Sequence, residues 1–197
     1  MDNNKLQIPY DNESVALLVI DMQEGFRDSA NKVASNIKTL VKNCHNRNIP
    51  IFWTQHGHIK LDDDVLVSWW GSDKSVKYGS ENWKILQELQ PHIERSPGSL
   101  GHLDFTITSK RQYDAFYGTE LNSLLGSLGI KTLIISGVMT NLCCESTARS
   151  GFIHNYNIVF LDDGCATINK EMHEATLINL RYGFATIAKI NDILDWL

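Results

Sequence analysis

Residues 132–148, with the sequence TLIISGVMTNLCCESTA, join a run of apolar residues to a stretch with helical spacing. The apolar run predicts a buried strand, and residues 140–151 predict a helix. Thr140 is of a residue type that caps helix N-termini, so Cys143 would lie in the first helical turn. Free N–H groups and the helix dipole favour a thiolate at such a place. Two interpretations stay open from this position alone: a nucleophilic Cys143, or a Cys143–Cys144 pair that packs in the core.

The same succession of apolar runs and helical patterns continues through the chain. We expect strands over 15–20, 49–55, 104–109, 131–136, 158–161 and 184–190, and helices over 29–47, 81–89, 118–128, 140–151 and 171–182. Strands that alternate with helices are typical of a parallel sheet with helices on both faces. The sequence therefore predicts an α/β fold with a Rossmann-like, doubly wound and mostly parallel sheet in three α/β/α layers.

Composition sets limits on the class of protein. The 197 residues are 43% apolar and 21% charged, with a formal net charge of −5, which fits one globular domain over residues 1–197. The negative charge argues against nucleic acid as a partner, and no apolar run is long enough to span a membrane. The polar residues 1–5 and four cysteines without a secreted spacing predict a cytoplasmic protein with reduced thiols.

Three residues with useful chemistry follow three of the expected strands. Asp21 follows the strand over 15–20, Lys110 follows that over 104–109, and Cys143 follows that over 131–136. Ligand sites in open α/β sheets form outside the carboxyl ends of the strands. A carboxylate that accepts a proton, an ammonium and a thiol that attacks form a working set for nucleophilic catalysis.

Four segments carry a resemblance that covers nearly the whole chain. The chain resembles the isochorismatase-like cysteine hydrolases in the segments LVIDMQEGF (18–26), Lys110 with AFYGT (115–119), GVMTNLC (137–143) and DGCAT (163–167). The resemblance implies that Cys143 is the nucleophile, that Asp21 takes its proton, and that Lys110 orients and polarises the pair. It also implies a cis peptide between Val138 and Met139, with the backbone N–H groups of Met139 and Cys143 as the oxyanion hole.

Cys143 and Cys144 are expected to have different roles. Consecutive helical residues point about 100° apart, so they cannot both face one substrate. The motif places Cys143 in register as the nucleophile, which leaves Cys144 to pack. With a cysteine at this place, the chain resembles the amidase branch of the family. Members of that branch cleave C–N bonds of small amide, carbamoyl or ureido compounds through an acyl-enzyme.

Nicotinamidases of this family often bind a metal through an Asp-x-His…His arrangement, which leads to an alternative function. This chain has Thr-Gln-His-Gly-His at residues 54–58, without the Asp at the matching place. Two histidines, His56 and His58, without an evident third ligand are weak grounds for zinc. We therefore expect no metal and no cofactor, and a metal-dependent nicotinamidase remains an alternative.

Aromatic residues are the candidates for binding a small-molecule substrate. We expect Phe26, Trp69, Trp70 and Tyr117 to supply an apolar wall, although aromatic residues also fill cores and subunit interfaces. The long, Trp-rich stretch 56–101 should cover the carboxyl edge of the sheet and set substrate choice. We also expect a homo-oligomer, in which this stretch would lie against a neighbouring subunit. His173 is expected to be a surface or interface residue.

Two functions of other classes use a similar fold. A redox or binding protein would use Cys143 and Cys144 as an oxidisable pair, but it would not need Asp21 and Lys110. A dinucleotide-dependent dehydrogenase is excluded because no G-x-G-x-x-G follows the first strand.

Overall fold

The structure is a computed structural model that describes residues 8–60, 64–90 and 104–197. Its centre is a six-stranded sheet in the order β3-β2-β1-β4-β5-β6, in which every neighbouring pair is parallel. The strands are β1 (Val15–Ile20), β2 (Ile51–Thr54), β3 (Asp104–Ile107), β4 (Thr132–Val138), β5 (Asn157–Ala166) and β6 (Thr186–Ala188). The prediction of a parallel, doubly wound sheet is confirmed.

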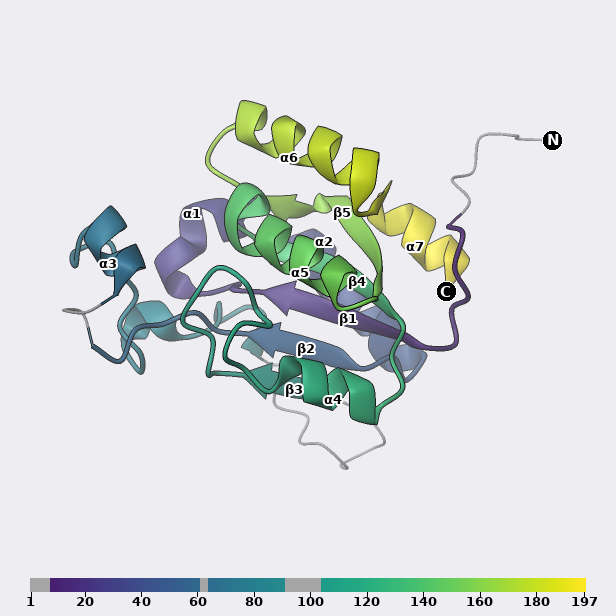
Figure 1. The fold of residues 1–197 in the computed structure, drawn as a ribbon, viewed down its shortest axis with the longest axis horizontal. Helices are drawn as coiled ribbons and strands as arrows, with labels where there is room; N and C mark the ends of the chain where they lie inside the picture. Colours follow the sequence, from purple (N-terminus) through teal and green to yellow (C-terminus); the bar gives the residue numbers. More distant parts are fainter. Residues whose placement is uncertain (1–7, 61–63, 91–103) are drawn as a thin grey trace.

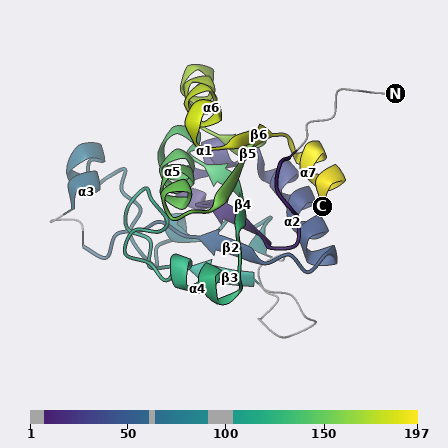
Figure 2. The same cartoon turned by 45° about the vertical axis from the view of Figure 1, so that its right-hand side comes forward.

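Helices cover both faces of this sheet, as Figure 2 shows. The helices are α1 (Arg27–Ala30), α2 (Ala34–Asn46), α3 (Val65–Trp70), α4 (Leu121–Ser127), α5 (Glu145–Ile153), α6 (Lys170–Gly183) and α7 (Ile190–Trp196). Residues of α2 and α7 share one apolar core with the sheet, and residues of α4, α5 and α6 share the other. The short helix α3 lies apart from the sheet (Figure 1). None of the helices described is both long and apolar enough to cross a bilayer.

β1 lies inside the sheet, and each of its residues is buried. Its uninterrupted apolar run is typical of a strand covered on both faces in a parallel sheet. The chain order reverses on either side of it, with β2 on one flank and β4 on the other. In this topology the carboxyl ends of β1 and β4 form the crevice where ligands bind.

Gly137 allows β1 and β4 to approach each other at this crevice. It pairs with Ile20 in the register of the sheet and has a φ of 117°. A Cβ at this position would lie 2.1 Å from the carbonyl oxygen of Ile20, so no larger residue fits without moving a strand. This close contact brings Asp21, directly after Ile20, beside the segment that follows β4.

The prediction of a helix over residues 81–89 is wrong. The structure has a 3-10 turn, η2 (Glu81–Trp83), and then an extended Lys84, because this segment pairs with the loop after β1. The N–H of Glu24 donates to the carbonyl of Lys84 and the N–H of Leu86 donates to that of Met22, while Gln23 bridges to Ile85. These long-range bonds replace the helical ones.

Other boundaries also differ from the sequence prediction. The strand expected over 184–190 is limited to β6, and the chain then forms α7, which was not predicted. At the start of this last helix the Asp192 carboxylate accepts a hydrogen bond of 2.8 Å from the N–H of Lys189. Part of the expected substrate cap, residues 61–63 and 91–101, lies outside the described residues.

Candidate active site

The structure brings together the three side chains expected from their positions after the strands. Lys110 Nζ donates a hydrogen bond of 2.7 Å to Asp21 Oδ2 and one of 3.4 Å to Cys143 Sγ. Asp21 and Lys110 are fully buried, and Cys143 is 6% exposed. The ammonium therefore joins the carboxylate and the thiol in one buried cluster at the carboxyl edge of the sheet.

Asp21 and Lys110 are both charged in this cluster. Burial opposes the charge on Asp21, but the Lys110 ammonium and a hydrogen bond from Thr54 hold its pKa below the usual value. The Thr54 hydroxyl donates to Asp21 Oδ1 at 2.5 Å. Burial likewise opposes the charge on Lys110, but Asp21 and Cys143 raise its pKa. The resting pair is thus a carboxylate and an ammonium, which is the state in which Asp21 can accept a proton.

Cys143 is held as a neutral thiol. Burial is the main cause that raises its pKa; the Lys110 charge opposes this rise and Asp21 adds to it, and the resulting pKa is about 12. The expectation that helix N–H groups would favour a thiolate is therefore wrong for the resting protein, because burial outweighs them. A thiol with so high a pKa needs a base when it attacks, and the Asp21 carboxylate lies in the same cluster, bonded to Lys110.

The segment that carries Cys143 is a π-helical turn, η4 (Thr140–Cys144), followed directly by α5. Its N-cap is Met139, and the expected cap by Thr140 is absent because the Thr140 hydroxyl bonds His173 instead. The peptide between Val138 and Met139 is cis, at the place that the resemblance implied. The oxyanion hole formed by the N–H groups of Met139 and Cys143 stays a prediction.

Cys144 points into the core, away from the cluster. It is fully buried and belongs to the apolar core under α4, α5 and α6. Its thiol lies beside that of Cys165, and burial raises its pKa well above the usual value. This placement agrees with a packing role, and it separates Cys144 from the side on which Cys143 meets Lys110.

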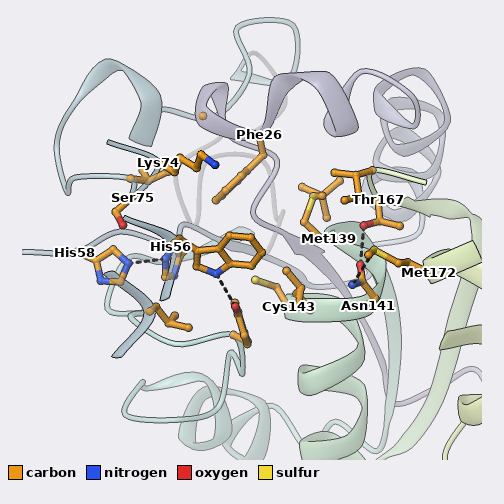
Figure 3. Close-up of a pocket in the computed structure, with 18 residues that line it drawn as sticks. Phe26, His56, His58, Lys74, Ser75, Met139, Asn141, Cys143, Thr167 and Met172 are labelled. Carbon is orange, nitrogen blue, oxygen red and sulfur yellow. Dashed lines mark hydrogen bonds between the residues drawn. The ribbon is translucent and has the colours of Figure 1, made fainter. Parts of the chain in front are cut away.

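Cys143 borders a cavity of about 280 Å³ (Figure 3). One side, the nucleophile wall, consists of Val138, Met139, Asn141, Leu142, Cys143, Thr167, Ile168 and Met172. The opposite side, the loop wall, consists of His56, His58, Leu66, Trp70, Lys74, Ser75 and Val76. Gly25, Phe26 and Tyr113 complete the lining. Most of these side chains are apolar, so the cavity suits a small molecule with an apolar part.

Two of the four expected substrate-binding residues line this cavity, Phe26 and Trp70. Trp69 is 77% exposed and lies outside it, because consecutive residues of α3 point about 100° apart. Tyr117 is 69% exposed and borders a shallow surface depression with Val65 and Ser146. The expectation that Trp69 and Tyr117 line the cavity is wrong.

His56 and His58 face each other in the loop wall. Their Nε2 atoms are 3.1 Å apart, and His58 Nδ1 lies 2.9 Å from Asp64 Oδ2. Burial is the main cause that lowers the pKa of His56 to about 3, so its ring is neutral. Within residues 8–60, 64–90 and 104–197, no three His, Cys, Asp or Glu side chains are grouped as ligands. These donors do not complete the set that a structural or catalytic zinc requires.

Sequence reasoning missed several residues that shape the site. Gln23 is fully buried; its amide oxygen accepts from the N–H of His56 and its amide nitrogen donates to the carbonyl of His56. Its place two residues after Asp21 was the only signal. His173, expected at the surface or an interface, instead links Thr140 to Asp162. No local pattern could reveal this contact between α6, η4 and β5.

Comparisons with known proteins show which family the chain belongs to. The Isochorismatase domain matches residues 15–192. The chain is 39% identical over 170 residues to Nicotinamidase 3 of Arabidopsis thaliana, and the aligned region covers 86% of this chain and 82% of the relative. It is 31% identical to the ureidoacrylate amidohydrolase RutB of Enterobacter sp. (strain 638), over 91% of this chain and 87% of the relative.

Solved structures share the fold. A cysteine hydrolase from Pseudomonas syringae pv. phaseolicola matches with a TM-score of 0.83 and 19% identity, over 100% of this chain and 98% of that one. N-carbamoylsarcosine amidase from Thermoplasma acidophilum matches with a TM-score of 0.73 and 23% identity, over 90% and 97%. With the domain match over residues 15–192, the chain belongs to the isochorismatase-like family of cysteine hydrolases.

Proposed function

We propose that this protein hydrolyses the C–N bond of a small, non-peptide amide through an acyl-enzyme on Cys143. The observation that carries the proposal is the buried Lys110 ammonium, which bonds both Asp21 and Cys143 beside an apolar cavity. Family membership and relatives named as a nicotinamidase and a ureidoacrylate amidohydrolase support the same reaction class.

The first half of the reaction makes a thioester. Asp21 takes the thiol proton while Cys143 Sγ attacks the amide carbon, because the thiol itself is neutral at rest. The backbone N–H groups of Met139 and Cys143 would then hold the negative oxygen, each worth about 3 kcal/mol of transition-state stabilisation. Asp21 returns the proton to the nitrogen, the C–N bond breaks, and ammonia or an amine leaves.

The second half consumes water. Asp21, again a carboxylate, takes a proton from the water that attacks the thioester carbon. The C–S bond breaks, the sulfur recovers that proton, and a carboxylic or carbamic acid leaves. Lys110 remains charged throughout, since its pKa is raised by Asp21 and Cys143. It holds the carboxylate in place and offsets the negative charge that passes between Asp21 and the sulfur.

Nicotinamide is the first substrate to test. Phe26 and Trp70 offer aromatic faces in the cavity, and the relative from Arabidopsis thaliana at 39% identity is named for this activity. A ureido acid is the second candidate, because its carboxylate needs a cationic partner and the described lining offers one Lys, Lys74. Its ammonium would pair with a carboxylate on the substrate, and the relative at 31% identity is named for ureidoacrylate.

The test measures ammonia released from nicotinamide, benzamide, ureidoacrylate and an N-carbamoyl amino acid. Mass spectrometry of protein quenched during turnover should show the acyl group on the peptide that carries Cys143. Turnover with Cys143→Ala at the wild-type rate would contradict the proposal, and so would an acyl group found on Cys144 instead. Preference for the ureido acids, lost in Lys74→Met, would identify the second candidate.

A further inference from the structure

The turn η4 must hold Cys143 within reach of both Lys110 and the substrate carbon. Its main chain is wider than an α-helical turn: the N–H groups of Leu142 and Cys144 both donate to the carbonyl of Met139, at 3.1 and 3.2 Å. Such π turns are rare and occur often at functional sites. A displacement of the nucleophile by about 1 Å can cost about 100-fold in rate. Contacts that hold this turn therefore bear directly on catalysis.

The hydroxyl of Thr140, at the start of the turn, forms a hydrogen bond with a residue of α6. Thr140 is fully buried, and its Oγ1 lies 3.0 Å from His173 Nδ1. The other ring nitrogen, Nε2, lies 3.0 Å from Asp162 Oδ1 on β5. These three residues, here the His173 network, run from the half-exposed Asp162 to the buried start of the turn.

The direction of the hydrogen bonds follows from the donors available. A carboxylate only accepts, so the proton on Nε2 belongs to the bond with Asp162. In a neutral ring Nδ1 is then an acceptor, and the Thr140 hydroxyl donates to it. Asp162 thus sets the tautomer that gives Thr140 its partner. The triad logic is familiar, but here it ends on a residue of the nucleophile turn and not on the nucleophile itself.

Neighbouring residues of α6 contact the same turn. The Asn141 amide donates to Met172 Sδ, and the Thr176 hydroxyl donates to Glu145, the residue that follows the turn, at 2.6 Å. Met172 and His173 precede Thr176 by four and three residues, so each lies about one helical turn from it. The first half of α6 therefore contacts the turn at its start and the residue that follows it, with His173 bonded to the buried hydroxyl of Thr140.

We infer that His173 is a positioning residue for Cys143, acting through Thr140, with Asp162 fixing its tautomer. The inference rests on the proposed role of Cys143 as the nucleophile. It assigns His173 no contact with the substrate, since the cavity is lined by its neighbour Met172 and not by His173. Loss of the network should let the turn shift, so that the thiol loses its alignment while the sheet and the cavity remain.

The test compares His173→Ala and Thr140→Val with the conservative variants His173→Asn and Thr140→Ser. His173→Asn keeps an acceptor near the place of Nδ1, and Thr140→Ser keeps the hydroxyl. We expect kcat per active site to fall about 10- to 100-fold in the first two, with KM changed less than about twofold, and to recover largely in the conservative pair. Glu174→Gln on the exposed face of α6 is the matched control and should keep the wild-type kcat.

A double-mutant cycle shows whether the two residues act through one bond. The variant with both Thr140→Val and His173→Ala should lose no more than either single variant. Losses that simply multiply would overturn the inference. So would a lower melting temperature with an unchanged kcat per active site, because that result describes a residue that only stabilises the fold.

Alkylation of Cys143 by iodoacetamide tests the network without a substrate. Burial raises the pKa of this thiol, so a loosened turn should expose it and speed alkylation about 3- to 10-fold at pH 8. If wild-type protein hydrolyses no amide, the proposed reaction fails and this measurement still judges the network. Equal alkylation rates in wild type, His173→Ala and Thr140→Val would overturn the inference.

Discussion

The two walls of the cavity are built in different ways. The nucleophile wall follows β4 and β5 and is backed by α6. Thr167 bonds Asn141 within this wall, and Thr140 bonds His173 behind it. The loop wall comes from the chain between β2 and β3, where the described residues form isolated bridges, such as that from His58 to Lys77, in place of a sheet. There the buried His56 Nδ1 has no hydrogen-bond partner among the described residues.

This difference separates two tasks. Attack on the amide carbon requires groups placed within a few tenths of an ångström, and sheet ends and packed helices supply that accuracy. Recognition of the rest of the substrate tolerates looser geometry and suits a connection that can change without disturbing the core. The comparison therefore predicts changes in kcat from the nucleophile wall and changes in KM or substrate preference from the loop wall.

The largest effect should come from the nucleophile. Cys143→Ala should remove all measurable hydrolysis, a loss of at least about 10⁴-fold in kcat, because no other thiol borders Lys110. Cys144→Ala should keep most of the activity and lose stability, about 1–2 kcal/mol for a small core side chain. Ammonia release and thermal melting measure the two variants. If Cys144→Ala abolished the activity and Cys143→Ala kept it, the roles assigned to the two cysteines would be reversed.

Asp21 and Lys110 can be told apart by a second measurement. Asp21→Asn and Lys110→Gln should each lower kcat by about 10³-fold or more, since one removes the base and the other the charge that holds it. Asp21 raises the pKa of Cys143 and Lys110 lowers it. Iodoacetamide should therefore alkylate Cys143 faster than wild type in Asp21→Asn, and more slowly in Lys110→Gln.

The sign of this test follows from the thiol. Wild-type Cys143, with a pKa of about 12, is protonated at pH 7, and its alkylation should rise about tenfold per pH unit up to pH 9. A plateau below pH 9 would contradict the neutral resting thiol. Each variant leaves one buried charge unpaired, at a cost of about 3–5 kcal/mol. Circular dichroism at the assay temperature must therefore show that it is folded.

A pair of adjacent tryptophans probes the loop wall. Trp70 lines the cavity and donates to Tyr113 at 2.7 Å, whereas Trp69 is 77% exposed. Trp70→Ala should raise KM about tenfold, the effect of losing an apolar contact with substrate, and should leave the alkylation rate of Cys143 unchanged. Trp69→Ala is the matched control and should change neither. Equal effects of the two variants would show that α3 contributes only packing.

The smallest effect should follow metal removal. Exhaustive chelation should leave activity within about twofold of the untreated protein, because the described donors around His56 and His58 do not complete a zinc site. Metal analysis of the purified protein is the independent measurement. If the chelator abolished the activity and zinc restored it, the loop wall would take part in catalysis, and the two walls would not have separate tasks.

The nucleophile wall could be predicted from the sequence more accurately than the loop wall, for a physical reason. Buried parallel strands leave continuous apolar runs, so β1 and β4 were expected where they lie, and the residues after them point to one edge by topology alone. The segment after β2 has no such pattern. The extended path of Lys84 depends on hydrogen bonds to the loop after β1, and the separation of Trp69 from Trp70 depends on how α3 is placed. His173 was misjudged because its partners lie on η4 and β5.

The wide spacing of the cluster along the chain has a consequence for how the protein folds. Lys110 is 89 residues from Asp21 and 33 from Cys143, and each belongs to a different parallel strand end. Closing loops of this length is slow, and parallel strands cannot pair through a local hairpin. No fragment made early in synthesis can contain the complete cluster. The first turnover by a refolding chain therefore marks the moment at which β1, β3 and β4 have all joined one sheet.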